Sequence, residues 1–237
     1  MERDLVSVME DLKARVKRLR FTAPVAYVYS PLEYAWPVAR AYFERYGRGP
    51  RDVLFLGMNP GPFGMGQTGI PFGEIAAVRD YLQLSGDISA PKRFHEKRPV
   101  LGFDCRRSEV SGQRLWSAFQ KRHARADDFF ARAFVLNYCP LLFVSETGAN
   151  ITPDKLEKTQ RRALETICDA ALADAIAILR PKHIVGIGAY AAKRASLVTG
   201  RAVVTMPHPS PASPAANKGW VEAARRALEQ AGLTDLL

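Results

Sequence analysis

The sequence predicts an α/β protein, a three-layer α/β/α sandwich around a four-stranded parallel sheet. Four short runs rich in β-branched or aromatic residues lack polar alternation, which is typical of strands that are covered on both faces. They are residues 53–57, 133–138, 183–188 and 202–206. Helix-forming stretches lie between these runs, and strands that alternate with helices favour a parallel sheet. No boundary for a second domain is evident, so residues 1–237 are expected to form one domain.

Amphipathic or well-delimited segments predict the helices in chain order. Residues 1–25 begin with a charged, amphipathic stretch, and we expect them to pack on the domain as an N-terminal helical extension. The longest helix is predicted over residues 153–180, where Thr152 can cap the start and Pro153 occupies the first turn. The other predicted helices are residues 31–46, 73–84, 111–123, 189–198 and 217–231.

The charge balance indicates a polyanionic partner. Lysine and arginine number 34 against 24 acids, which gives a formal net charge of +10 and favours nucleic acid. The excess is concentrated between Lys92 and Arg125, where aromatic residues are interleaved with the basic ones. A solvated basic surface that only keeps the protein soluble is the alternative at this point, and the aromatic residues can equally belong to the core.

The sequence also lacks the signals of several other protein classes. No apolar run approaches the length of a membrane span, and no secretory signal is evident, so no membrane partner is expected. The three cysteines are widely spaced and form no CxxC pair, so no zinc or iron–sulfur site and no other cofactor is expected. This cysteine usage predicts a reducing compartment.

Polar residues follow the predicted strands at the edge where open α/β sheets bind their ligands. Asn59 comes just after the first strand, Asn137 ends the second, and His208 comes just after the fourth. We expect these three side chains to converge. Each has a structural alternative, since Asn59 can be a simple turn residue, Asn137 can bond a neighbouring loop, and the prolines beside His208 can make it structural.

Two loops next to these residues have unusual composition. Residues 57–73, GMNPGPFGMGQTGIPFG, contain six glycines and three prolines. Glycine permits close approach of the backbone and proline stiffens it, so this loop predicts a pocket built partly from backbone. Residues 208–214, HPSPASP, form a stiff loop with hydroxyl groups, which suits phosphate contacts and insertion between stacked bases.

These motifs resemble those of the uracil-DNA glycosylase superfamily, and more narrowly the single-strand-selective monofunctional uracil-DNA glycosylases. The resemblance extends through RPVLGFDCRRSEVSGQRLW, FVLNYCPLLF and TPDKLEKTQRRALETICDAAL, and covers most of the chain beyond about residue 25. It implies a DNA repair enzyme that flips out uracil or 5-substituted uracils such as 5-hydroxymethyluracil. Hydrolysis of the N-glycosidic bond then leaves an abasic site for base excision repair.

The resemblance also implies the setting in which the enzyme works. Its partner is uracil-containing DNA, single- or double-stranded, and it acts as a monomer without a metal ion. The location is the cytoplasmic nucleoid if the source is bacterial and the nucleus if it is eukaryotic.

The same resemblance implies a role for each matching position. Asn59 positions the attacking water and His208 stabilises the departing base. Asn137 reads the uracil edge, and Phe72 stacks on the base. Met58 and Gly61 complete the substrate contacts. Gly61 leaves the C5 side of the base open and filled by water, which a hydroxymethyl group displaces and a methyl group does not.

The loop that carries the histidine is implied to enter the DNA. Its contact residues are Pro209, Ser210, Pro211, Ala212, Ser213 and Lys218. Family members often carry a basic residue where this chain has Ala212, which predicts a weaker plug for the hole left by the flipped base.

Two other functions remain open from the residues alone. A non-catalytic nucleic-acid-binding module of the same fold explains the charge and the stiff loop, but not the convergence of two asparagines and a histidine. A nucleotide hydrolase requires a metal-binding acid cluster or a phosphate-binding loop, and neither is present in the sequence.

Overall fold

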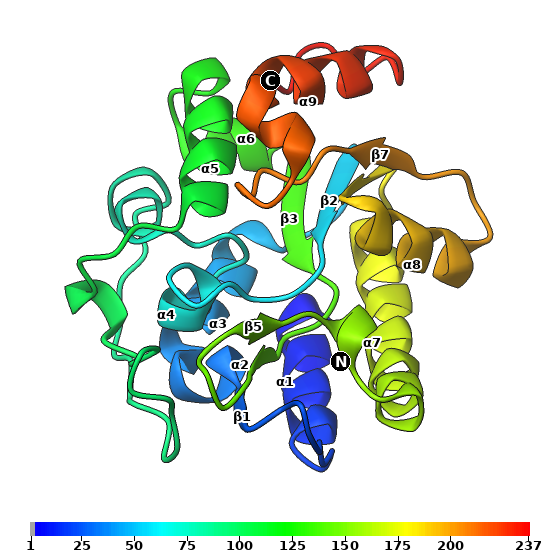
Figure 1. The fold of residues 1–237 in the computed structure, drawn as a ribbon. Helices are drawn as coiled ribbons and strands as arrows, with labels where there is room; N and C mark the ends of the chain where they lie inside the picture. The colour runs from blue at the N-terminus through cyan, green and yellow to red at the C-terminus, as the bar shows by residue number, and fades with distance from the viewer. Residues whose placement is uncertain (1–2) are drawn as a thin grey trace.

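Four parallel strands lie at the centre of the computed structural model, which describes residues 3–237 (Figure 1). They are β2 (Val53–Gly57), β3 (Ala133–Asn137), β6 (His183–Ile187) and β7 (Val204–Met206), in the order β3-β2-β6-β7. Every residue of β2 and β3 is buried, which explains why these runs show no alternation. The predicted parallel sheet is therefore confirmed.

Helices cover the sheet. Figure 1 shows α7 and α8 on one side of the strands and α3 and α5 on the other. The apolar face of α1 joins the main hydrophobic core through Leu5, Val8, Met9, Leu12 and Val16. The helices are α1 (Leu5–Val16), α2 (Pro31–Tyr34), α3 (Trp36–Tyr46), α4 (Met65–Thr68), α5 (Val110–Arg122), α6 (Ala126–Phe130), α7 (Lys158–Leu179), α8 (Ala189–Thr199) and α9 (Trp220–Glu229).

The predicted boundaries of the longest helix were wrong. Residues 153–155 form a separate 3₁₀ turn, and α7 begins only at Lys158. Glu157, not Thr152, caps α7, because its carboxylate accepts hydrogen bonds from the backbone N–H groups of Thr159 (2.8 Å) and Gln160 (3.1 Å). A carboxylate also interacts favourably with the positive end of a helix dipole, which gives it an advantage over a hydroxyl at this position.

Two other predicted helices are shorter than expected. The helix predicted over 31–46 is divided into α2 and α3, since Pro37 lies in the first turn of α3. The helix predicted over 73–84 is reduced to a single π-helical turn, Ala77–Tyr81. Gln83 follows this turn with a left-handed φ of 52°, a conformation that ends a helix.

A second, antiparallel sheet was not predicted. It consists of β1 (Tyr27–Tyr29), β4 (Leu142–Val144) and β5 (Asn150–Ile151) in the order β1-β4-β5. Strands of two or three residues are too short to show a period of two, so the sequence pattern could not reveal them. Its strands β4 and β5 follow β3 in the chain, and Asn150 and Thr152, at the end of this segment, line the candidate site.

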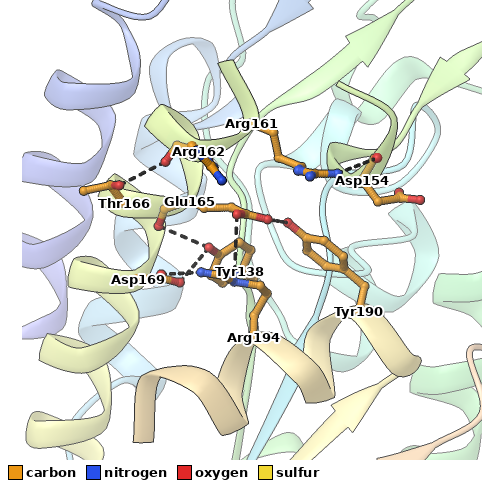
Figure 2. A network of polar contacts seen from close by, with 9 residues as sticks. All are labelled: Tyr138, Asp154, Arg161, Arg162, Glu165, Thr166, Asp169, Tyr190 and Arg194. Atoms are coloured by element: carbon orange, nitrogen blue, oxygen red, sulfur yellow. Dashed lines mark hydrogen bonds and ion pairs between the residues drawn. The ribbon is translucent and has the colours of Figure 1, made fainter. Parts of the chain in front are cut away.

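A network of polar side chains holds the segment that follows β3 (Figure 2). The hydroxyl of Tyr138 donates to Asp169 at 2.7 Å, and the hydroxyl of Tyr190 donates to Glu165 at 3.0 Å. Arg194 on α8 pairs with both carboxylates, at 3.3 Å from Glu165 and closely with Asp169. Because Tyr138 directly follows the last residue of β3, the network fixes the carboxyl end of that strand between α7 and α8.

We expect Arg194→Met to lower the free energy of unfolding by about 3 kcal/mol, because Glu165 and Asp169 would lose the cation that compensates them. The side chains of Arg194 and Glu165 are only 13% and 16% exposed. Urea denaturation measures the change. Arg162→Met, at an exposed arginine on α7, is the matched control and should alter stability by less than about 0.5 kcal/mol. Equal stability of the two variants would contradict a structural role for the network.

Candidate active site

A cavity of about 680 Å³ lies at the carboxyl edge of the sheet. It brings together the residues that the sequence analysis assigned to catalysis and substrate binding, namely Met58, Asn59, Gly61, Phe72, Asn137 and His208. Four residues of the proline-rich loop also line it, namely Ser210, Pro211, Ala212 and Ser213. Pro209 and Lys218 lie outside the lining, Pro209 being buried and Lys218 exposed. The predicted convergence of the two asparagines and the histidine is therefore observed.

Asn137 presents an amide oxygen without a partner. Its side chain is buried at the end of β3, and its Nδ2 donates to Met65 Sδ at 3.2 Å. Its Oδ1 has no hydrogen-bond partner within the described chain. A Cβ atom on Gly57, the register partner of Asn137, would collide with this oxygen and with the ring of Phe72. A buried acceptor without a partner costs free energy, so a ligand that supplies a donor is favoured here.

Phe72 is held in an unusual backbone conformation. Its φ is 53°, a left-handed value that is strained for a bulky residue. Its carbonyl accepts hydrogen bonds from Trp116 Nε1 (3.1 Å) and from the N–H of Glu74 (2.7 Å). Its ring centroid lies 5.8 Å from that of His208. These contacts hold the ring on the cavity wall at the cost of local strain.

His208 is fixed by hydrogen bonds to the residues on either side of it. Trp220 Nε1, at the start of α9, donates to the carbonyl of Pro207 at 2.8 Å. Arg114, on α5, donates to the carbonyl of Pro209 at 2.9 Å. Since neither proline can change its φ freely, these two contacts define the path of the backbone through His208.

The imidazole of His208 is neutral at physiological pH. Burial lowers the pKa of His208 to about 4, because an apolar environment disfavours the charged form. The backbone N–H of Ser210 donates to Nδ1 at 3.1 Å. Nδ1 is therefore the unprotonated nitrogen, and Nε2 carries the proton and is a hydrogen-bond donor.

Asn59 is oriented through its amide nitrogen. Nδ2 lies 3.4 Å from the carbonyl oxygens of Pro60 and Leu141. Neither contact uses the amide oxygen, which can accept a hydrogen bond from a water molecule. The side chain is half-buried and lines the same cavity as His208 and Asn137.

Glu109 is a cavity residue that the sequence analysis missed. Its carboxylate accepts hydrogen bonds from Ser111 Oγ (3.0 Å) and from the N–H of Phe63 (3.2 Å), and burial raises the pKa of the Glu109 carboxyl. A Cβ atom on Gly61 would collide with this carboxyl group. The expectation that the space beside Gly61 is open and filled by water was therefore wrong, because Glu109 occupies it. In the sequence Glu109 is an isolated acid in a basic stretch, and no motif marks it.

The described residues form no metal centre. Within residues 3–237, no group of three or more His, Cys, Asp or Glu side chains is arranged to hold a metal ion. None of the helices in that part of the chain is long and apolar enough to span a membrane.

Comparisons with known proteins agree with this geometry. The sequence profile of the uracil DNA glycosylase superfamily matches residues 45–230. The chain is 48% identical over 231 residues to the single-strand selective monofunctional uracil-DNA glycosylases of Rattus norvegicus and Mus musculus, which covers 95% of this chain and 83% of each relative. The crystal structure of wild-type SMUG2 from Pedobacter heparinus has a TM-score of 0.62 at 17% identity and covers 94% of both chains. The chain belongs to the uracil DNA glycosylase superfamily and, within it, to the single-strand selective monofunctional family.

Proposed function

We propose that this protein is a monofunctional uracil-DNA glycosylase, which hydrolyses the N-glycosidic bond of uracil in DNA and leaves an abasic site for base excision repair. One observation carries the proposal. A single cavity joins the unpartnered oxygen of Asn137, the neutral donor Nε2 of His208 and the oriented amide of Asn59. These are the groups needed to read a uracil edge, stabilise its anion and position a water molecule.

Asn137 reads the base through both halves of its amide. Its free Oδ1 accepts a hydrogen bond from the N3–H of uracil. Its Nδ2 gives up the weak hydrogen bond to Met65 Sδ and donates to uracil O4 instead. Cytosine presents a donor at N4 and an acceptor at N3, so its polar groups do not match those of the Asn137 amide. Because these mismatched groups would be buried, the site rejects cytosine. Phe72 lies beside His208 and stacks on the base.

His208 stabilises the leaving group. Cleavage of the C1′–N1 bond places negative charge on uracil, mostly at O2 and O4, and positive charge on the sugar. The Nε2–H group of His208 donates to O2 and acts on charge that develops in the transition state. A neutral donor suffices because uracil is a tolerable leaving anion.

Asn59 orients the nucleophile without deprotonating it. An amide is too weak a base to remove a proton from water, so the water captures a sugar cation that has already formed. None of the lysines is among the residues that line the cavity, and an enzyme without such an amine forms no Schiff base and does not cleave the strand.

The substrate is DNA in which the uracil nucleotide leaves the stack or is already single-stranded. The net charge of +10 supplies phosphate binding that weakens with salt. The protein acts as a monomer in the compartment that holds the genome. The proline-rich loop, residues 209–218, enters the space left by the flipped nucleotide.

We also propose that the substrate range includes 5-hydroxymethyluracil. Gly61 lies at the C5 side of the base, and the carboxyl group of Glu109 occupies the space that a side chain on Gly61 would take. A hydroxymethyl group can donate a hydrogen bond to this polar wall, whereas the methyl group of thymine cannot and loses affinity.

Incubation with a uracil-containing oligonucleotide in EDTA, followed by alkali, tests the proposal. Strand breaks at uracil are expected after alkali and not before it. Binding of the oligonucleotide without any alkali-labile site would contradict the proposal and would favour the nucleic-acid-binding module.

The pH dependence follows from the lowered pKa of His208. Single-turnover excision should be level between about pH 5 and pH 8, since the pKa of about 4 keeps the imidazole neutral throughout. Unfolding releases a histidine of ordinary pKa, about 6.5, so stability is full above that pH and is lost as the pH falls toward 4. His208→Gln, which does not titrate, should lose less stability over the same pH range. Urea unfolding at each pH measures the difference. An inflection in rate near pH 6.5 would contradict a neutral donor.

Tyrosine at position 61 tests the C5 proposal. In Gly61→Tyr the new side chain collides with the carboxyl group of Glu109 from its Cβ atom onward, so excision of uracil and of 5-hydroxymethyluracil should both fall. In Gly61→Tyr with Glu109→Ala, uracil excision should recover to the rate of Glu109→Ala alone, while 5-hydroxymethyluracil excision stays at least about tenfold below that of Glu109→Ala. Single-turnover cleavage of matched oligonucleotides measures both. An equal effect on the two bases in the double variant would show that Gly61 does not face C5.

A further inference from the structure

A second hollow of about 460 Å³ adjoins the candidate active site. Phe63 lines both cavities and forms their shared wall. We call the second cavity the side hollow; its lining residues are Phe63, Glu96, Lys97, Pro99, Leu101, Asp104, Cys105, Arg106 and Arg107. The mechanism proposed above uses none of its residues.

The side hollow carries positive charge that the protein does not neutralise. The guanidinium of Arg107 lies 3.8 Å from the ring centroid of Phe63, and that of Arg98, which is not a lining residue, lies 5.3 Å from it. No ion pair among residues 3–237 involves Lys97, Arg98, Arg106 or Arg107. The two acids of the lining therefore leave these cations free for an anionic ligand.

The side hollow also has an apolar side. Leu101 is 52% exposed, one of the largest exposures of an apolar side chain in the described protein, and Pro99 lies close to it in the chain. A surface that combines aliphatic and aromatic groups with free cations matches a nucleotide, whose base is flat and apolar on its faces and whose phosphate is anionic.

The side hollow is tied rigidly to the glycine-rich loop of the active site. Gln67, which is buried, donates to the carbonyl oxygens of Pro62 (2.8 Å) and Pro99 (2.9 Å) and accepts from the N–H of Leu101 (2.8 Å). The side chain of Gln67 thus fixes the position of one cavity wall relative to the other. Phe63 therefore separates two cavities whose walls are tied together.

We propose that the side hollow binds a nucleotide that neighbours the flipped uracil on the same DNA strand. Its base lies against Leu101 and Pro99, and its phosphate contacts Lys97 and Arg106. The proposal rests on the proposed glycosylase function, to which it adds a subsite on one side of the uracil.

Oligonucleotides extended from the uracil in only one direction test it. The substrates are single strands with a uracil near one end that carry nucleotides on the 5′ side only, on the 3′ side only, or on both sides. The test variant is Lys97→Glu with Arg106→Glu. The matched control is Arg162→Glu with Lys193→Glu, which makes the same change in charge at exposed positions of α7 and α8.

We expect the test variant to lose at least about tenfold in kcat/KM on the strand extended in one of the two directions. The other one-sided strand should change no more than it does with the control. For a uracil-free single strand, the logarithm of the binding constant falls linearly with the logarithm of the salt concentration. The slope of this plot should be smaller in magnitude by about 0.7 for each phosphate that the variant no longer binds. Leu101→Ser should reduce kcat/KM on the same one-sided strand without changing the salt slope.

Other outcomes separate the two proposals. Equal losses on both one-sided strands, or losses matched by the control, would overturn the side hollow as a subsite while uracil excision still supports the glycosylase. An absence of excision by the unmodified protein would overturn the glycosylase, and the salt slope of uracil-free strands would still report on phosphate binding by the hollow.

Discussion

Replacing either His208 or Asn59 by alanine is expected to slow single-turnover excision of uracil by about 10² to 10³ while leaving DNA binding nearly unchanged. In the mechanism that we propose, the two side chains act on the transition state, His208 on the charge that develops at uracil O2 and Asn59 on the attacking water. Both line the cavity, whereas the basic groups that we expect to bind phosphate lie outside it. Single-turnover kinetics and fluorescence anisotropy measure the two effects separately.

His183→Ala is the matched control for the histidine. His183 is exposed and stands at the start of β6, at the opposite edge of the sheet from the cavity. This variant should excise uracil at the rate of the unmodified protein. Rates close to normal for both His208→Ala and Asn59→Ala would remove the two residues from the mechanism.

Asn137→Asp is expected to reduce uracil excision by at least about 10². The carboxylate offers no donor to uracil O4 and repels it, in a buried position where water cannot compensate. Because carboxylates accept from cytosine N4–H₂, trace excision of cytosine is the further expected result. Oligonucleotides that carry uracil or cytosine at one position measure both rates.

Thermal unfolding separates loss of chemistry from loss of fold in the Asn137 variants. Asn137→Ala serves as the second variant, because it removes both polar atoms without burying a charge. It should also excise uracil slowly, and it should not gain activity on cytosine. Unchanged uracil kinetics in either variant would place Asn137 outside the base-reading site.

The parts of the fold that the sequence predicted are those in which one physical requirement dominates. Strands covered on both faces must be apolar throughout, so β2 and β3 are visible in the residue pattern. Ligands bind at the carboxyl ends of such strands, so the residues that follow them could be assigned to one edge. Asn59, Asn137 and His208 were identified in this way.

The remaining features depend on tertiary contacts that a single sequence does not encode locally. Glu109 meets Gly61 only because of the path of the long, largely irregular segment between Leu82 and Glu109. The cap at Glu157 was missed because a turn intervenes after Pro153. The three-stranded second sheet has strands too short to carry a periodic signal.

The fixed path of the backbone through His208 has a consequence for how damaged sites are selected in a genome. Trp220 and Arg114 hold the residues beside the imidazole before any DNA arrives, and Phe72 is held in its strained conformation by Trp116. The conformational entropy of the residues around His208 and Phe72 is therefore lost on folding and not on DNA binding. The free energy that varies from one DNA site to another is then the cost of unstacking the nucleotide. Uracil in mismatched, frayed or single-stranded DNA unstacks most easily, so we expect an enzyme with a rigid site to excise uracil from such DNA faster than from well-stacked duplex.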